Sequence, residues 1–312
     1  MIKKYFIFLV TVCILFLGTG VRSFAITPIP ADPWDILGYP VERWQDRRFG
    51  VFRWQRFPQI LIFDTATFYI QDRLFKRLAF FVEKAGFRGR LAHDHEIAGL
   101  HGWNAHDYNA PDLAAFFETA RQTGFPLLPE EWDLMNILFA NDIIRWNAAS
   151  QIVPGSGVVL SLSRQSSVDL RRRFMTHEGF HGLYFIDEDF RRFTRQRWEV
   201  FPDAGKDLLF AFFHLQEYDT TDLELVLKEF KAHVLQLPIT QISWYFGQHL
   251  PNRLLTENAA LYRQYLPERQ EIRDGRPFFP DLVTIFTAEA EVFSRYVNDR
   301  WGFAAGRVWQ NR

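Results

Sequence analysis

Cysteine is almost absent from this chain: the 312 residues contain one, Cys13, close to the N-terminus. A fold held together by disulfides is therefore excluded, and so is a metal site built from several thiolates. The chain also lacks an excess of charge, with 36 Lys and Arg against 37 Asp and Glu. Because nucleic-acid binding needs a basic excess, we expect no nucleic acid among the partners.

Apolar and aromatic side chains are plentiful, at 48% and 17% of the residues. A chain of this length and composition can bury a large core, which argues against disorder. We expect an α+β fold, mostly helical, with a small sheet beside the helix predicted around residues 168–185, which would bind a metal. The expected organisation is an N-terminal arm and helical α/β region over 26–150 and a second region over 151–312, unless 26–312 form one continuous domain.

The first 25 residues have the pattern of a signal peptide. Lys3 and Lys4 precede an apolar run from Tyr5 to Leu17, and Ser23-Phe24-Ala25 supplies small residues where signal peptidase cuts. The pattern predicts export to the periplasm or the extracellular space, with no stable membrane insertion after cleavage. An uncleaved anchor is the alternative. A lipoprotein is disfavoured because Val12 precedes Cys13.

One motif stands out, the H-E-x-x-H sequence formed by His177, Glu178 and His181. The region from Val168 to Phe185 contains no Pro and has helical apolar spacing, with Ser166 or Ser167 as the expected N-cap. Residues four apart share a helix face, so both imidazoles could bind one divalent ion, with Glu178 beside them. Gly179 and Gly182 weaken such a helix, which suggests a close approach there.

A third ligand is expected from the helix predicted over residues 221–237. Glu224 shares its face with Lys228 and Lys231, a pattern typical of a solvated surface. Glu229 shares its face with apolar residues, and a carboxylate directed inward is costly unless it is paired or bound to a cation. We therefore favour Glu229 over Glu224, with Glu217 as a third candidate.

The two segments together resemble the gluzincin group of zinc metallopeptidases, to which thermolysin belongs. The resemblance covers His177-Glu178-Gly179-Phe180-His181 and Glu229-Phe230-Lys231-Ala232, which begins 48 residues after His181. Lys228 and His233 depart from it, since thermolysin-like members have Asn before the ligand Glu and Asp one turn later.

The resemblance implies a zincin-like core and hydrolysis of peptides or proteins. One Zn²⁺ would be held by His177, His181 and Glu229, with Glu178 as general base. The oxyanion donor is open among Tyr245, His249, Tyr262 and His233. The competing hypothesis is a non-catalytic envelope protein in which a structural metal or a buried polar site joins two helices.

Four histidines, His93, His95, His101 and His106, crowd one polar segment. The His-x-His spacing of the first two permits a separate metal site, but the Asp-His pair of binuclear hydrolases does not follow. A polar loop of hydrogen-bonded histidines is the simpler interpretation. A third is that this loop borders the cleft.

The remaining pattern predicts an irregular arm over 26–58 and strands over 59–63 and 158–163. The second strand is interpreted either as the edge on which an extended peptide docks or as an ordinary hairpin strand. Helices are predicted over 64–85, 112–124, 129–146 and 281–301.

Overall fold

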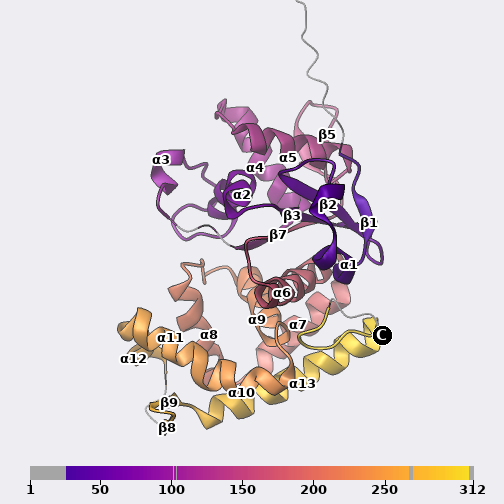
Figure 1. Ribbon diagram of the computed structural model, residues 1–312. Coiled ribbons are helices and arrows are strands. Elements are labelled where there is room, and N and C mark those ends of the chain that lie inside the picture. The colour runs from indigo at the N-terminus through magenta and orange to yellow at the C-terminus, as the bar shows by residue number, and fades with distance from the viewer. Residues whose placement is uncertain (1–25, 101, 103, 267–269, 309–312) are drawn as a thin grey trace, which may run out of the picture.

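The computed structural model describes residues 26–100, 102, 104–266 and 270–308. The predicted signal peptide and His101 lie outside these residues. A sheet with helices above it forms one half of the molecule, and most of the later helices form the other half beneath it (Figure 1). The expected α+β class, mostly helical, is confirmed. Among the described residues no helix is both long and apolar enough to cross a bilayer.

The main sheet has five strands in the order β1-β2-β3-β7-β4. It is mixed, because β1–β2 and β3–β7 pair in parallel while β2–β3 and β7–β4 are antiparallel. The strands are β1 (Ile29–Ala31), β2 (Phe49–Trp54), β3 (Ile60–Thr65), β4 (Ala105–Asn109) and β7 (Val158–Ser163). β7 comes after residue 150, where the sequence predicted a division into two regions. Its two neighbours in the sheet, β3 and β4, come before that residue.

The interpretation of residues 158–163 as an edge strand is wrong. β7 is buried along its whole length between β3 and β4. The edge strands are β1 and β4, and the sequence of β4, Ala-His-Asp-Tyr-Asn, does not have the β-branched or apolar pattern typical of strands. The predicted irregular arm is also wrong in part, because it contributes β1, the helix α1 (Pro33–Gly38) and the largely buried β2.

Two apolar cores cover the two faces of the sheet, since successive strand side chains point in opposite directions. Phe63 and Tyr108 face the upper helices α2 (Phe68–Val82), α4 (Ala110–Thr123) and α5 (Pro129–Ala140). Ile62 and Leu160 face the lower half. α2 begins later than predicted because Thr67 caps it, and α5 ends earlier than predicted, before β5 (Ile144–Trp146).

The helix α6 (Val168–Ile186) lies directly beneath the sheet (Figure 1). Its closest approach is at Gly182, where an added Cβ would lie 2.8 Å from Cδ1 of Ile60 in β3. At Gly179 an added Cβ would lie 3.0 Å from Cγ1 of Val308. The close approach predicted for the two glycines is therefore confirmed, by the sheet at Gly182 and by the C-terminal segment at Gly179. The other lower helices include α7 (Glu188–Val200), α8 (Asp203–Leu215), α9 (Leu223–Leu235), α11 (Leu250–Glu257) and α13 (Pro280–Trp301).

Candidate metal centre

The helix α6 carries the H-E-x-x-H motif. Its first turn is capped by Ser167, whose hydroxyl oxygen accepts a hydrogen bond from the Leu170 backbone N–H at 3.3 Å. His177 and His181 lie one turn apart on the same face, with ring centroids separated by 4.6 Å. His181 is fully buried, while His177 reaches a cavity.

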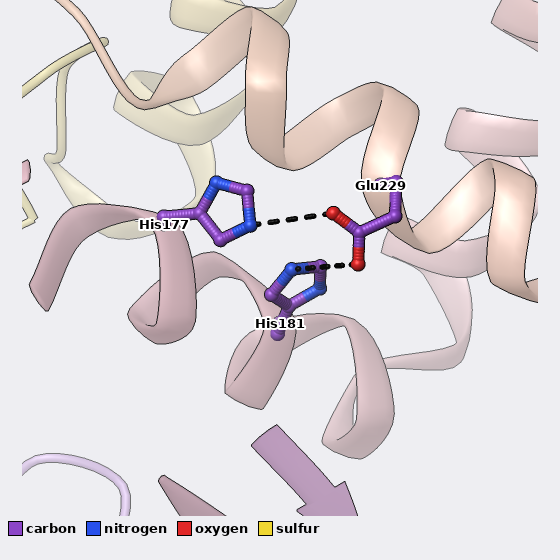
Figure 2. Close-up of side chains that lie close together, drawn as sticks. All are labelled: His177, His181 and Glu229. Atoms are coloured by element: carbon purple, nitrogen blue, oxygen red, sulfur yellow. Dashed lines mark ion pairs between the residues drawn. The ribbon is translucent and has the colours of Figure 1, made fainter. Parts of the chain in front are cut away.

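The helix α9 brings Glu229 to the same point. Its first turn is capped by Asp222, and Glu229 points inward as predicted, with 2% of its surface exposed. Glu229 Oε2 lies 3.4 Å from His177 Nε2, and Oε1 lies 3.5 Å from His181 Nε2 (Figure 2). The structure thus brings together the three predicted ligands from two helices.

The two rejected carboxylates lie elsewhere. Glu224 is exposed on α9, where it pairs with Arg195 and accepts a hydrogen bond from the Tyr184 hydroxyl at 3.0 Å. Glu217 is 71% exposed, and its Oε2 lies 3.6 Å from Lys84 Nζ. Neither side chain belongs to a potential metal-binding group among the described residues.

The arrangement of His177, His181 and Glu229 fits a small divalent cation. The ligand atoms are 3.4 and 3.5 Å apart. Tetrahedral ligands at about 2.1 Å from zinc would be about 3.4 Å apart, which matches these separations. His181 Nε2 and Glu229 Oε2 are buried and make no hydrogen bond within the described residues. Because unsatisfied buried polar atoms are costly, their convergence suits a cation.

Charge and burial keep these ligands in forms that can bind a metal. Burial alone would raise the pKa of Glu229, but the facing His177 together with Lys228 and His233 lowers it to about 2. Burial lowers the pKa of His181 well below its usual range, and the charge on Lys231 lowers it further. At neutral pH the site therefore holds a carboxylate opposite a neutral imidazole.

Gln236 links two imidazoles through its amide. Its Oε1 lies 3.3 Å from His177 Nδ1, and its Nε2 lies 2.9 Å from His233 Nδ1. The amide oxygen can only accept and the amide nitrogen can only donate. His177 Nδ1–H is therefore the donor, which leaves His177 Nε2 unprotonated and directed at Glu229. The sequence had suggested no partner for His177.

His181 has an amine as its partner. Its Nδ1 lies 2.9 Å from Nζ of Lys231, and this amine also donates to the Lys228 carbonyl oxygen at 2.9 Å. Burial lowers the pKa of Lys231 to about 7. With this pKa, roughly half of the Lys231 amine is uncharged at pH 7, and this form can accept from Nδ1–H, which leaves His181 Nε2 free for a metal.

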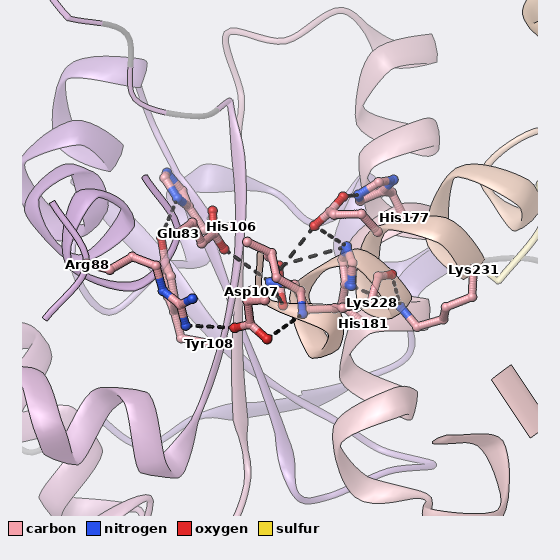
Figure 3. Close-up of polar contacts among 12 residues, drawn as sticks. Glu83, Arg88, His106, Asp107, Tyr108, His177, His181, Lys228 and Lys231 are labelled. Carbon is pink, nitrogen blue, oxygen red and sulfur yellow. Dashed lines mark hydrogen bonds and ion pairs between the residues drawn. The ribbon is translucent and has the colours of Figure 1, made fainter. Parts of the chain in front are cut away.

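The prediction that Lys228 and Lys231 occupy a solvated face is wrong. Both are buried, at 5% and 0% exposure. Lys228 Nζ lies 3.1 Å from Glu83 Oε1 and 3.0 Å from Asp107 Oδ2 (Figure 3). A charged side chain can be buried when it is paired in this way, and these carboxylates come from other parts of the chain.

Asp107 is the site residue that sequence reasoning missed. It lies on the edge strand β4, and its carboxylate, that of Glu178 and the ring of His181 each offer a ligand atom within 4.8 Å of the other two. Burial raises the pKa of Asp107 to about 8 in spite of Lys228. Burial raises the pKa of Glu178 well above its usual range, and Asp107 and Glu229 add to this effect.

A cavity of about 380 Å³ opens beside His177 and contains Glu178 and Glu229 in its walls. Of the four candidate oxyanion donors, the structure places Tyr245, His249 and His233 in this cavity but not Tyr262. Tyr262 instead lies on α12 (Ala259–Tyr265) and donates to Gln270 Oε1 at 2.5 Å. A larger cavity, of about 540 Å³, has Lys228 but no histidine in its lining.

The described histidines of the polar segment, His93, His95 and His106, lie in two different places. His93 and His95 flank the start of the short helix α3 (Asp94–Ile97) and stack at 5.6 Å. They join no potential metal-binding group among the described residues. His106 lies on β4, next to Asp107, and lines the 380 Å³ cavity. Among the described histidines of the segment, His106 is therefore the one that borders the cleft.

Compared with protein-family models, curated proteins and solved structures, the chain matches none. Its function must therefore be inferred from the chemistry of the site itself.

Proposed function

We propose that this protein is an exported zinc metallopeptidase of the gluzincin type, with a zincin-like core, that hydrolyses peptide or protein substrates. The observation that carries the proposal is the convergence of His177, His181 and Glu229 from two helices, next to the carboxylate of Glu178. Two imidazoles and one carboxylate are a ligand set of catalytic zinc, which keeps one position for water.

When bound, zinc would supply an acidified water and polarise the scissile carbonyl group. Glu178 is placed to take a proton from that water and to pass it to the leaving amine, since its carboxylate lines the cavity beside the ligands. Glu178 would be favoured in its ionised form beside a bound cation, which would oppose the effect of burial on its pKa.

Two candidate oxyanion donors, Tyr245 and His233, line the same cavity. Tyr245 is 5% exposed, and its hydroxyl lies 3.3 Å from His233 Nδ1. His233 Nδ1 already accepts from Gln236, so His233 carries its proton on Nε2. Burial raises the pKa of Tyr245 to about 12, so its hydroxyl keeps its proton at neutral pH. Either group could donate a hydrogen bond to a developing oxyanion.

The substrate would lie in the 380 Å³ cavity, along the side formed by β4. Ala105, His106 and Asp107 of this edge strand all line it. An edge strand offers backbone groups to an extended peptide. The docking role considered for residues 158–163 therefore passes to β4 in this proposal.

The competing function is a non-catalytic envelope protein in which the metal only joins α6 to α9. Glu178 separates the two functions, because a structural site has no use for a base beside an open position. In the structural case all four positions around the metal would be filled by the protein. The cavity over His177 instead favours a site open to solvent.

The test is Glu178→Gln. We expect this variant to keep one zinc per chain, measured by elemental analysis, and to lose peptide cleavage by about 10²- to 10⁴-fold, as expected for removal of a general base. The control is Glu224→Gln, which changes an exposed carboxylate on α9. It should leave both the zinc content and the rate of peptide cleavage unchanged.

Full cleavage by the Glu178→Gln protein would remove Glu178 from the mechanism. Zinc content below one per chain in the wild type, or unchanged in Glu229→Gln, would contradict the metal site itself.

A further inference from the structure

Arg173 is a cation in the cavity that is not paired with an acid. It lies on α6 four residues before His177, so it occupies the same helix face one turn earlier. It is half-buried and lines the 380 Å³ cavity together with His177 and Glu178. Its guanidinium lies 6.0 Å from the ring centre of Tyr245.

Within the described residues, no carboxylate oxygen lies within 4.0 Å of the Arg173 guanidinium, and no hydrogen bond to it is formed. A guanidinium does not lose its proton in proteins, so the positive charge stays in the cavity wall. Its five N–H donors form a planar fork that matches a carboxylate.

The neighbouring arginines show that an arginine without an acidic partner is unusual in this region. Arg171 donates to Asp64, and Arg172 lies 3.5 Å from Asp169. Arg253, in the same cavity as Arg173, donates to both oxygens of Glu257 at 2.8 and 2.9 Å. Of these four, Arg173 is the one that lines the cavity without an ion pair to a carboxylate among the described residues.

The lining of the cavity carries charges of both signs. Glu83, Asp107, Glu178 and Glu229 contribute carboxylates, and Arg173, Arg253 and His249 are among the other side chains. Burial lowers the pKa of His249, and the charges of Arg253 and Arg173 lower it further, so His249 is neutral at pH 7. The fixed positive charge available to an anion therefore comes from Arg173.

From this geometry we infer that Arg173 binds a carboxylate of the substrate close to the bond that is cleaved. The inference rests on the proposed function and names its substrate class, peptides that carry a negative charge near the scissile bond. That carboxylate is either the C-terminus of the peptide or the side chain of an Asp or Glu. Both present the same two oxygens to the guanidinium fork.

The experiment measures binding rather than cleavage. Three N-acetylated tetrapeptides of alanine and phenylalanine are titrated calorimetrically into the full-length Glu178→Gln protein. The first ends in a free carboxylate, the second ends in an amide, and the third ends in an amide and contains one Glu. Each titration is done with zinc and again after removal of metal by a chelator.

We expect the first or the third peptide to bind about 10- to 100-fold more tightly than the neutral one, the range of a charge-assisted hydrogen-bonded pair. Which of the two gains affinity tells a terminal carboxylate from an acidic side chain. Arg173→Met should abolish the difference, and Arg173→Lys should keep part of it. Arg172→Met, which changes the neighbouring half-buried arginine outside the cavity lining, should keep all of it.

Equal affinity for the three peptides, no binding of any of them, or a preference that survives Arg173→Met would overturn the inference. Its failure is distinguishable from failure of the proposed function. A protein that binds no zinc and cleaves nothing would still show the carboxylate preference in the metal-free titrations if Arg173 has this role.

Discussion

Two buried groups of charges meet the same helix, α6, and they differ in how completely they are paired. Near its start, the wholly buried Asp64 of β3 accepts hydrogen bonds from Arg171 at 2.7 and 3.1 Å and from Arg164 at 2.5 Å. Arg164 also donates to the carbonyl oxygens of Ile36 and Tyr39. Every charge in this first group has a partner within the protein.

Two turns later, the second group is built on His177, Glu178 and His181. Buried atoms of Glu178, His181 and Glu229 make no hydrogen bond within the described part of the chain. The comparison teaches how a structural charge cluster differs from a candidate site on one helix. The first group joins the helix to the sheet, whereas the second has acceptors left over that point to one place and suit a cation.

The largest effect should come from breaking the paired group. Arg171→Met would leave the buried Asp64 with Arg164 alone, and removing one partner of a buried ion pair is strongly destabilising. We expect the free energy of unfolding, measured by urea denaturation without metal, to fall by about 3 kcal/mol. Arg172→Met, on the solvent side of the same turn, should change it by less than about 0.5 kcal/mol.

Equal effects of the two arginine substitutions would mean that the Asp64 group does not hold α6 to the sheet. The first group could then no longer be contrasted with the second as a structural charge cluster.

A smaller effect is expected from acid. The pKa of Glu229 in the folded, metal-free protein is about 2, below its ordinary value near 4.5. Its ionised form therefore contributes stability above about pH 4.5, and this contribution is lost as the pH falls toward 2. In urea denaturation between pH 6 and pH 3, the metal-free wild type should lose more stability than Glu229→Gln. Parallel curves for the two proteins would show that the unpaired group does not respond to acid in this way.

The smallest effect concerns Gln236, which orients His177. Gln236→Leu removes the acceptor for Nδ1–H, so the ring is no longer held with Nε2 toward Glu229. Loss of such an orienting partner weakens metal binding about 10- to 100-fold. Zinc affinity, measured by competition with a chromogenic chelator, should fall by this factor. Gln236→Glu keeps an acceptor and should recover most of it; equal affinity of the leucine variant and the wild type would argue against this role.

Local sequence signals predicted the helices and the strand that are specified by residues close to one another in the sequence. The helix that carries His177 has its serine cap and helical spacing, and the helix over 110–123 has both of its signals, Asn109 at its start and Gly124 in the left-handed conformation after its end. β7 also lies at its predicted residues. Such signals involve neighbours in the sequence, so no tertiary information was needed.

Contacts between distant segments were beyond the sequence. β4 has a polar sequence, and it is a strand because it pairs with β7 some 50 residues later. Lys228 and Lys231 have the spacing of a solvated face, yet they are buried because Glu83, Asp107 and His181 meet them from three other elements. The position of β7 in the sheet depended on β4 in the same way.

The sequence by itself determined that two imidazoles stand one turn apart on a helix with a carboxylate beside them, since helical periodicity fixes that arrangement. It also favoured Glu229 over Glu224, because a carboxylate on an apolar face must find a charged partner. Only the tertiary structure decided which groups surround this motif: Asp107 from an edge strand, Gln236 behind His177, and Arg173 facing an open cavity. The reason is that charges are buried or left unpaired according to what packs against them, and those partners come from segments far apart in the chain.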